Sequence, residues 1–283
     1  KFERIPNVSR ILKYTTLIIV AGSVANVILE IDKFMINRYE AIENVAYYGV
    51  AIYIATVIGV PYRSMYQIVN PLTAKLLNEK NKIDLKILYQ KSSLTLFIIS
   101  GFIFLMIILN INELYKLINE SYVDGLIVVF IIGLTKLSDS LLGNNNAILF
   151  NSDYYRMVLV LGVLLAVLTI VLNMVFIPLY GINGAAFATF IAILIYNISK
   201  ILFVYFKFKI LPFSANTIKV VLLLLVCLGV FYFWDFKFHP VLNIALKSLL
   251  ITMFYGFVVY ALHLSDDISI LLNKIFRKNK HTS

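Results

Sequence analysis

The sequence predicts an all-α fold, a polytopic membrane helical bundle of about eight transmembrane helices. Of the 283 residues, 61% are hydrophobic and only 14% are charged, whereas a soluble domain has about a quarter of its residues charged. Apolar runs recur along the whole chain, and each is long enough to cross a hydrocarbon core of about 30 Å. Lys and Arg fall on alternate sides of these runs, as expected when successive helices cross a membrane in opposite directions.

The eight expected spans follow one another through short links. Pro61 is expected to kink the second span, because proline removes a backbone hydrogen bond. The fourth span has an alternative, longer form that continues through Asn144-Asn145-Asn146. The longest expected outside loop covers about Asn110 to Gly125. We place the spans at residues 11–31, 45–69, 92–109, 126–142, 157–177, 182–203, 218–233 and 241–262.

A tight reversal is expected between the fifth and sixth spans. Pro178 suits a helix end because it cannot donate a backbone hydrogen bond, and Gly181 and Gly184 permit a sharp turn. Gly184, Ala188 and Ala192 recur every fourth residue, and such a stripe of small side chains lets membrane helices approach closely. The simpler interpretation is a hairpin between two buried helices with no further role.

The placement of cationic residues predicts the orientation of the chain. Cytoplasmic loops carry an excess of Lys and Arg, and most of the 25 such residues fall on one side when both ends of the segment are cytoplasmic. The opposite side holds Lys33, Arg38, Lys116, Lys237 and Lys247. Because topology explains the net charge of +10, we expect no nucleic-acid partner. The cations expected in the cytoplasm are Lys1, Arg4, Arg10, Lys13, Lys75, Lys80, Lys82, Lys86, Lys91, Arg156, Lys200, Lys207, Lys209, Lys219, Lys274, Arg277, Lys278 and Lys280.

The two ends of the chain carry further signals. Residues 1–13 resemble a basic connecting loop, so we expect the chain to be the later part of a longer protein. The tail from Ser265 to Lys280 alternates Ile and Leu with polar residues and ends basic. One interpretation is an amphipathic helix on the anionic inner leaflet, and the other is an ordinary basic flank of the last span.

Signatures of an enzyme are missing from the sequence. The three histidines are scattered without an i, i+4 partner, and the single cysteine, Cys227, lies in an apolar run. We therefore expect no metal site, no cofactor and no catalytic residues. The carboxylates Glu113, Glu120 and Asp124 leave acid–base chemistry open in principle, although a solvated loop is the simpler interpretation.

Charges inside the spans are the best candidates for a functional site. Such residues are costly in the hydrocarbon core and normally face a bundle interior or a watery cavity. Lys136 lies near the midplane, about 16 Å beyond Gly125, and Asp139 follows on the same helix face. The pair either neutralises itself and fixes the helix, or forms the charged wall of a cavity or a coupling site.

Other polar residues are weaker candidates, each with two interpretations. Arg63 either extends to the interface or faces a cavity, where its planar fork suits a phosphate. Glu30 and Asp32 lie near the outer rim of the first span, with Asn26 one turn before Glu30. They either cap the rim or contact a substrate or gate. Asn144 is expected to help line a polar cavity, together with Gln67, Asn70 and Asn197.

Several motifs in this order resemble the oligosaccharide (polysaccharide) flippases of the multidrug/oligosaccharidyl-lipid/polysaccharide exporter superfamily, which are MATE-like transporters. The resemblance covers essentially all of the chain. Members look like two six-helix lobes, often followed by two more helices, so the first lobe would be absent here. The motifs are Glu30–Ile36, Val45–Tyr53 with Pro61 and Pro71, Asn144–Leu149, Asn173, Ile177-Pro178, Tyr180-Gly181 and Gly184–Thr189.

The resemblance implies both an organisation and a function. Residues 1–210 would form the second lobe, 211–264 two additional transmembrane helices, and 265–283 a basic cytoplasmic tail. The protein would flip a lipid-linked oligosaccharide, built on undecaprenyl diphosphate, across the bacterial inner membrane for surface polysaccharide or O-antigen synthesis. Its partners would be the bilayer, the lipid-linked oligosaccharide, the missing lobe and polysaccharide polymerase machinery. Arg63 or Lys136 would attract the diphosphate, and Asp139, Glu30 or Asp32 would bind a coupling ion or proton.

Four alternatives stay open at this point. A multidrug or toxin antiporter of the same superfamily would prefer acidic and aromatic cavity residues, and a flippase for lipid II would use similar charges. A membrane polymerase or ligase would need a large outer loop with catalytic residues. A scaffold protein would use buried charges for packing alone.

Overall fold

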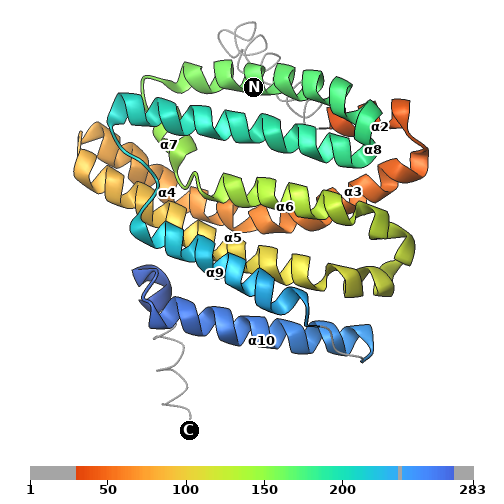
Figure 1. Ribbon diagram of the computed structural model, residues 1–283. Helices are drawn as coiled ribbons and strands as arrows, with labels where there is room; N and C mark the ends of the chain where they lie inside the picture. Colours follow the sequence, from red (N-terminus) through yellow and green to blue (C-terminus); the bar gives the residue numbers. More distant parts are fainter. Residues whose placement is uncertain (1–29, 235–237, 271–283) are drawn as a thin grey trace, which may run out of the picture.

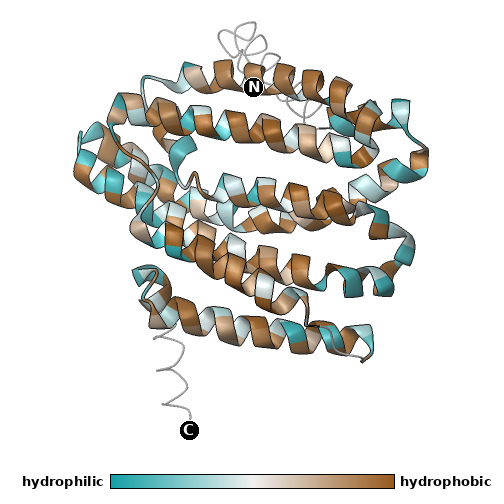
Figure 2. Ribbon diagram, in the orientation of Figure 1, coloured by the Kyte–Doolittle hydropathy of each residue, from teal (hydrophilic) through white to brown (hydrophobic). Residues whose placement is uncertain are grey.

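The computed structural model describes residues 30–234 and 238–270 of the chain. Within these ranges all regular elements are helical, and long helices lie side by side in a bundle (Figure 1). Apolar residues dominate the long helices, and hydrophilic residues gather mainly at helix ends (Figure 2). Among the described residues, six stretches are long and apolar enough to cross a membrane. The predicted all-α, polytopic membrane bundle is therefore confirmed.

The helices that cross the bundle are joined by short links and two 3-10 turns. Asn26 and nearly all of the first expected span, 11–31, lie outside the described residues. In chain order the elements are α2 (Ile31–Tyr39), α3 (Ile42–Thr56), η1 (Val57–Gly59), α4 (Val60–Asn78), α5 (Lys82–Ile118), η2 (Glu120–Gly125), α6 (Leu126–Ser140), α7 (Asn145–Phe150), α8 (Tyr155–Phe208), α9 (Ala215–Tyr232) and α10 (Pro240–Ala261).

Helix α8 contains two of the expected spans. Its 54 residues would measure about 80 Å if straight, but the chain folds back on itself at Gly181 (Figure 1). Gly181 has φ 57° and ψ −135°, a conformation that a side chain disfavours. Just beyond it, a Cβ on Gly184 would overlap the carbonyl oxygen of Phe176 in the first leg. The stripe residues Gly184, Ala188 and Ala192 are all buried.

Helix α5 is longer than the sequence predicted. It runs for 37 residues, about 55 Å, and is therefore longer than a hydrocarbon core of about 30 Å. The predicted loop at Asn110–Gly125 is wrong, because α5 continues to Ile118 and η2 fills the rest. The apolar residues Ile111 and Tyr115 explain the extension, since both are buried against α3 and α6. At its start, the Asn81 side chain caps the helix by accepting from the Asp84 amide at 3.1 Å.

The second expected span is broken where Pro61 predicted a kink. Helix α3 gives way to the 3-10 turn η1, and α4 begins at Val60 with Pro61 in its first turn. A proline fits there because the first backbone N–H groups of a helix have no intrahelical acceptor.

The fourth expected span is broken as well. Helix α6 ends at Ser140, and Gly143 turns the chain at φ 51° before α7 begins at Asn145. A Cβ on Gly143 would lie 2.6 Å from the Ser93 amide nitrogen, so the turn sits directly against α5. The Ser93 hydroxyl donates to the Leu141 carbonyl at 2.6 Å, and the Asn144 amide donates to the Ser92 hydroxyl at 3.2 Å. Non-helical backbone is tolerated at membrane depth when the protein satisfies its polar groups in this way.

Helix α5 forms the centre of the largest hydrophobic core. Its residues Phe97, Phe104 and Leu105 pack in one cluster with Leu224 of α9 and Tyr255 of α10. The Tyr255 hydroxyl donates to the Ile98 carbonyl at 2.9 Å, which joins α10 to α5 directly. A division of the chain after residue 210 stays a prediction, and α9 and α10 contact α5 extensively.

We expect Gly184→Ala to destabilise the protein by about 1–3 kcal/mol, because the new methyl group overlaps the backbone of the first α8 leg. Gly162→Ala is the matched control in the same helix, since a Cβ there meets no atom within 4 Å. The control should leave the protein as stable or raise its stability by up to about 1 kcal/mol. Thermal unfolding of both variants in detergent measures the difference, and equal midpoints would contradict the assigned role of Gly184.

Candidate functional site

A cavity of about 590 Å³ opens between α3, α4, α6, α7 and the second leg of α8. We call it the basic cavity, because its charged lining residues are Arg63, Lys136, Lys200 and the single carboxylate Asp139. Both breaks in the expected spans border it, η1 through Val57 and Gly59 and the α6–α7 turn through Leu142. The remaining lining residues are Tyr53, Thr56, Val60, Tyr62, Ser140, Asn146 and Tyr196.

The structure brings three of the predicted candidates together. Arg63 on α4 and Lys136 and Asp139 on α6 all line the basic cavity. The Lys136 side chain passes Gly59 of η1, where a Cβ would lie 3.7 Å from its Cδ. An alanine at position 59 would therefore make an ordinary van der Waals contact with the lysine stem.

Lys136 and Asp139 do not neutralise each other. Within the described ranges no ion pair joins them, and Asp139 instead accepts a hydrogen bond from the Asn197 side-chain amide at 2.7 Å. Asn197 also donates to the Ser138 hydroxyl at 3.3 Å and is buried. The self-neutralising interpretation is therefore wrong for this part of the chain, and the carboxylate is held by α8.

Lys200 is a site residue that sequence reasoning missed. The charge pattern predicts a cytoplasmic position for it, but Lys200 is 4% exposed and lines the basic cavity. Its ammonium donates to Asn146 Oδ1 at 3.3 Å and lies 4.1 Å from the ring centre of Tyr196. A usable signal was the spacing of Tyr196, Asn197 and Lys200, because residues three and four apart share one helix face.

The three consecutive asparagines at the start of α7 contact neighbouring helices, and each has a different partner. Asn144 is fully buried, donates to the Thr73 hydroxyl at 2.7 Å and does not line the cavity. Asn145 donates to the Tyr89 hydroxyl at 2.5 Å. Asn146 donates to the Tyr62 hydroxyl at 2.9 Å and reaches the cavity. The expectation that Asn144 lines the cavity is thus wrong, because its amide is used to fix the helix break.

Glu30 and Asp32 lie apart from the basic cavity, beside α2. Glu30 is exposed and forms an ion pair with Lys33 at 2.5 Å. Asp32 is 5% exposed and accepts hydrogen bonds from the Tyr48 hydroxyl at 2.6 Å and the Lys33 amide at 2.9 Å. Burial raises the pKa of the Asp32 carboxyl, and these hydrogen bonds, together with the Lys33 charge, partly oppose the rise. Asp32 is therefore a second candidate site for a proton or cation.

The comparisons with known proteins gave one finding. A family model described as MatE matches residues 18–123, which include Asp32, Tyr48 and Arg63. Lys136, Asp139 and Lys200 lie beyond the matched region. No curated protein and no solved structure matched the chain. This part of the chain is therefore similar to the MatE family of membrane transporters, and the match covers less than half of the chain. Together with the six apolar helices of the described residues, it indicates a multi-pass membrane protein.

The stability contribution of Asp32 should depend on pH. A folded-state pKa above the unfolded value makes folding most favourable when the carboxyl is protonated, so this contribution is lost as pH rises through the folded pKa. Asp32→Asn keeps the shape of the side chain and removes the titration. We expect the wild type to lose thermal stability relative to Asp32→Asn as pH rises from about 4, and a pH-independent difference in unfolding midpoint would contradict this.

Proposed function

We propose that the protein flips a lipid-linked oligosaccharide, built on undecaprenyl diphosphate, across the bacterial inner membrane for surface polysaccharide synthesis. The observation that carries this proposal is the charge of the basic cavity, where three cations face one carboxylate inside an apolar bundle. None of the three cations forms an ion pair within the described residues. Such a cavity favours an anionic substrate.

The three cations suit a diphosphate in different ways. The Arg63 guanidinium offers a planar fork of donors, and the Lys136 and Lys200 ammonium groups are compact charges with three donors each. A diphosphate leaving water needs these donors, because an unpaired anion is very costly in a medium of low dielectric constant. The cavity therefore replaces the hydration of the headgroup with fixed charges.

The uncharged lining suits the glycan. Tyr53, Tyr62 and Tyr196 present aromatic faces together with hydroxyl groups, and Asn146 and Thr56 add further polar atoms. Tyrosine combines an apolar ring with a hydrogen-bonding tip, which fits the alternating polar and apolar surface of sugars. In this mechanism the headgroup crosses through the cavity while the isoprenoid chain stays in the bilayer.

Transport requires the cavity to open alternately to the two sides. We infer that the described helices up to residue 210 belong to one lobe, that α9 and α10 are the two additional helices, and that a six-helix first lobe would complete the pathway. The breaks at η1 and at the α6–α7 turn place irregular backbone at the cavity wall, an arrangement found at the substrate sites of many transporters. Asp139 and the buried Asp32 are the candidates for a coupling proton or cation, whereas Glu30 is exposed and paired with Lys33.

The orientation proposed for the lobe places its more basic end in the cytoplasm. One end of the bundle carries Lys80 in the α4–α5 link, Lys82 at the start of α5 and Lys209 just after α8, and the opposite end carries the Gly181 reversal. Lys200 lines the basic cavity and no longer counts toward the cytoplasmic side. The excess of positive charge at the α4–α5 end remains without it. Both ends of the segment would then be cytoplasmic.

A multidrug or toxin antiporter is the second candidate function, because the MatE match at residues 18–123 supports the superfamily as a whole. Such an antiporter binds organic cations, for which three lining cations are unfavourable. A flippase for lipid II is a close variant of the main proposal, since that substrate also carries a diphosphate.

The combined variant Arg63→Ala, Lys136→Ala and Lys200→Ala tests the proposal. Each lost charge-assisted hydrogen bond costs about 1.5–3 kcal/mol, so we expect surface glycan to fall at least about tenfold and lipid-linked oligosaccharide to accumulate inside. Lys75→Ala and Lys82→Ala are the controls, because these lysines sit in the polar end of the bundle outside the cavity.

Two outcomes would contradict the proposal that the protein is a flippase. Unchanged glycan export in the triple variant, with normal protein levels in the membrane, would exclude a role for the cationic lining. Unchanged glycan together with increased sensitivity to cationic drugs would favour the antiporter instead.

A further inference from the structure

Two adjoining hollows lie at the Gly181 end of the bundle, away from the basic cavity. The first, of about 650 Å³, is lined by Glu113 and Lys116 of α5, Glu120 of η2 and Lys247 of α10, and we call it the head pocket. The second, of about 490 Å³, is lined mainly by apolar residues of α5, α6 and α9, including Ile127, Phe130 and Leu228, and we call it the chain groove. Neither shares a lining residue with the basic cavity.

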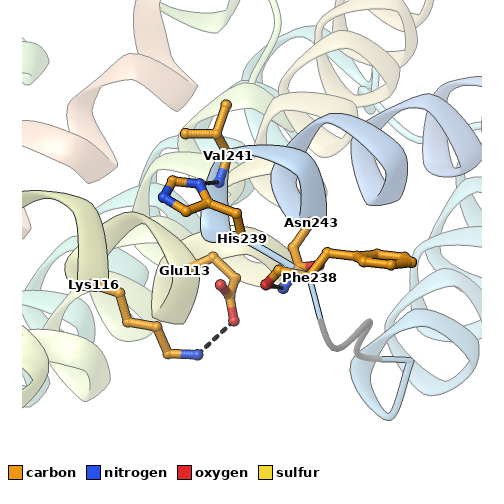
Figure 3. Close-up of polar contacts among 6 residues, drawn as sticks. All are labelled: Glu113, Lys116, Phe238, His239, Val241 and Asn243. Carbon is orange, nitrogen blue, oxygen red and sulfur yellow. Dashed lines mark hydrogen bonds and ion pairs between the residues drawn. The ribbon is translucent and has the colours of Figure 1, made fainter.

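The head pocket contains both acidic and basic side chains, and two of them are buried. Glu113 is 9% exposed and Lys247 is 5% exposed. Glu113 and Lys116 lie one turn apart on α5 and face the start of α10 (Figure 3), with 2.7 Å between Lys116 Nζ and Glu113 Oε1. The other carboxylate oxygen, Glu113 Oε2, is buried and has no hydrogen-bond partner among the described residues. A buried carboxylate oxygen without a donor is costly, and it points to a ligand that supplies one.

The head pocket and the chain groove are continuous. Ile108, Asn112, Tyr232 and Phe233 line both hollows. Glu113 lies five residues before the end of α5 and Lys247 seven residues after the start of α10, so both are roughly 8–10 Å from a helix end. A charged pocket at this depth beside an apolar groove is complementary to an amphipathic lipid. The polar head of such a lipid would lie near the membrane surface, and its acyl chain would lie along the helices.

We propose that the head pocket and the chain groove bind a phospholipid with a primary ammonium and a phosphate, such as phosphatidylethanolamine. The ligand ammonium donates to Glu113 Oε2, and the phosphate accepts from Lys116 and Lys247. An ammonium has three donors, so Lys116 can keep its bond to Glu113 Oε1 while it contacts the phosphate. Two carboxylates and two ammonium groups line the pocket, which matches a headgroup with no net charge.

The charges also predict which lipids are rejected. Phosphatidylcholine has the same phosphate, but its quaternary ammonium has no N–H to donate to Glu113 Oε2. Phosphatidylglycerol has no cation and brings a net negative charge toward Glu113 and Glu120. This selectivity depends on the charges of the head pocket, which shares no lining residue with the basic cavity, and so it is independent of what the basic cavity transports.

Lipid retention measured on the purified full chain tests the proposal. The protein is reconstituted in nanodiscs with equal amounts of phosphatidylethanolamine, phosphatidylcholine and phosphatidylglycerol of the same acyl chains. Native mass spectrometry then counts the lipids that stay bound. We expect phosphatidylethanolamine to be retained about tenfold more than either competitor, the effect of one charge-assisted hydrogen bond.

Two variants with matched controls test the head pocket and the chain groove separately. Glu113→Gln removes the acceptor charge and should abolish the preference, whereas Glu43→Gln, at an exposed glutamate outside both hollows, should keep it. Gly229→Leu fills the chain groove, since a Cβ at Gly229 meets no atom within 4 Å, and should lower retention about tenfold. Gly256→Leu on α10 has the same open space outside the groove and should have no effect.

Equal retention of the three lipids by the wild type would overturn the proposal. So would equal retention by Gly229→Leu and Gly256→Leu, because that result places the bound lipid elsewhere on the helices. If Glu113→Gln fails to fold, the wild-type selectivity and the pair of glycine variants decide the question.

Discussion

The structure depends on one constraint, that polar backbone groups released inside an apolar bundle must find partners. The α6–α7 turn breaks a membrane helix beside the basic cavity. Ser92 and Ser93 of α5 form hydrogen bonds with the backbone of this turn. The three asparagines that follow bind α4 and α5 through Thr73, Tyr89 and Tyr62. Hydrogen bonds of this kind replace the helical ladder in lipid, and they hold Asn146 and Lys200 together at the cavity wall.

The same constraint governs the charges of the cavity. Asp139 is held by Asn197 rather than by a lysine, so the cations stay available to whatever enters. A buried ion pair between Lys136 and Asp139 would have satisfied both groups within the protein and left little reason for an anion to bind. Lys200 is likewise supported by neutral partners, the Tyr196 ring and the Asn146 side-chain amide, and not by a carboxylate.

Much of the fold is predictable from hydropathy, and much of the site is not. Hydropathy located the described spans, and Pro61 and Gly181 marked a break and a reversal, because their effect on the backbone is local. The length of α5 was missed because Ile111 and Tyr115 are helical through contacts with α3 and α6, which are distant in sequence. Lys200 was assigned to a flank because a cation near a span end resembles a topology signal, and only the packing of α8 on α6 and α7 shows that it faces inward.

Helix α5 contacts α4, α6, α9 and α10, so it is the central helix against which these four helices pack. Leu224 of α9 and Tyr255 of α10 pack in the core cluster of α5, and the Tyr255 hydroxyl donates to the Ile98 carbonyl, so a displacement of α5 would displace α9 and α10 as well. If the described helices move during the proposed transport, α9 and α10 would therefore move together with α5. In the proposed transport cycle, the surrounding lipid would then have to rearrange around α9 and α10 as well.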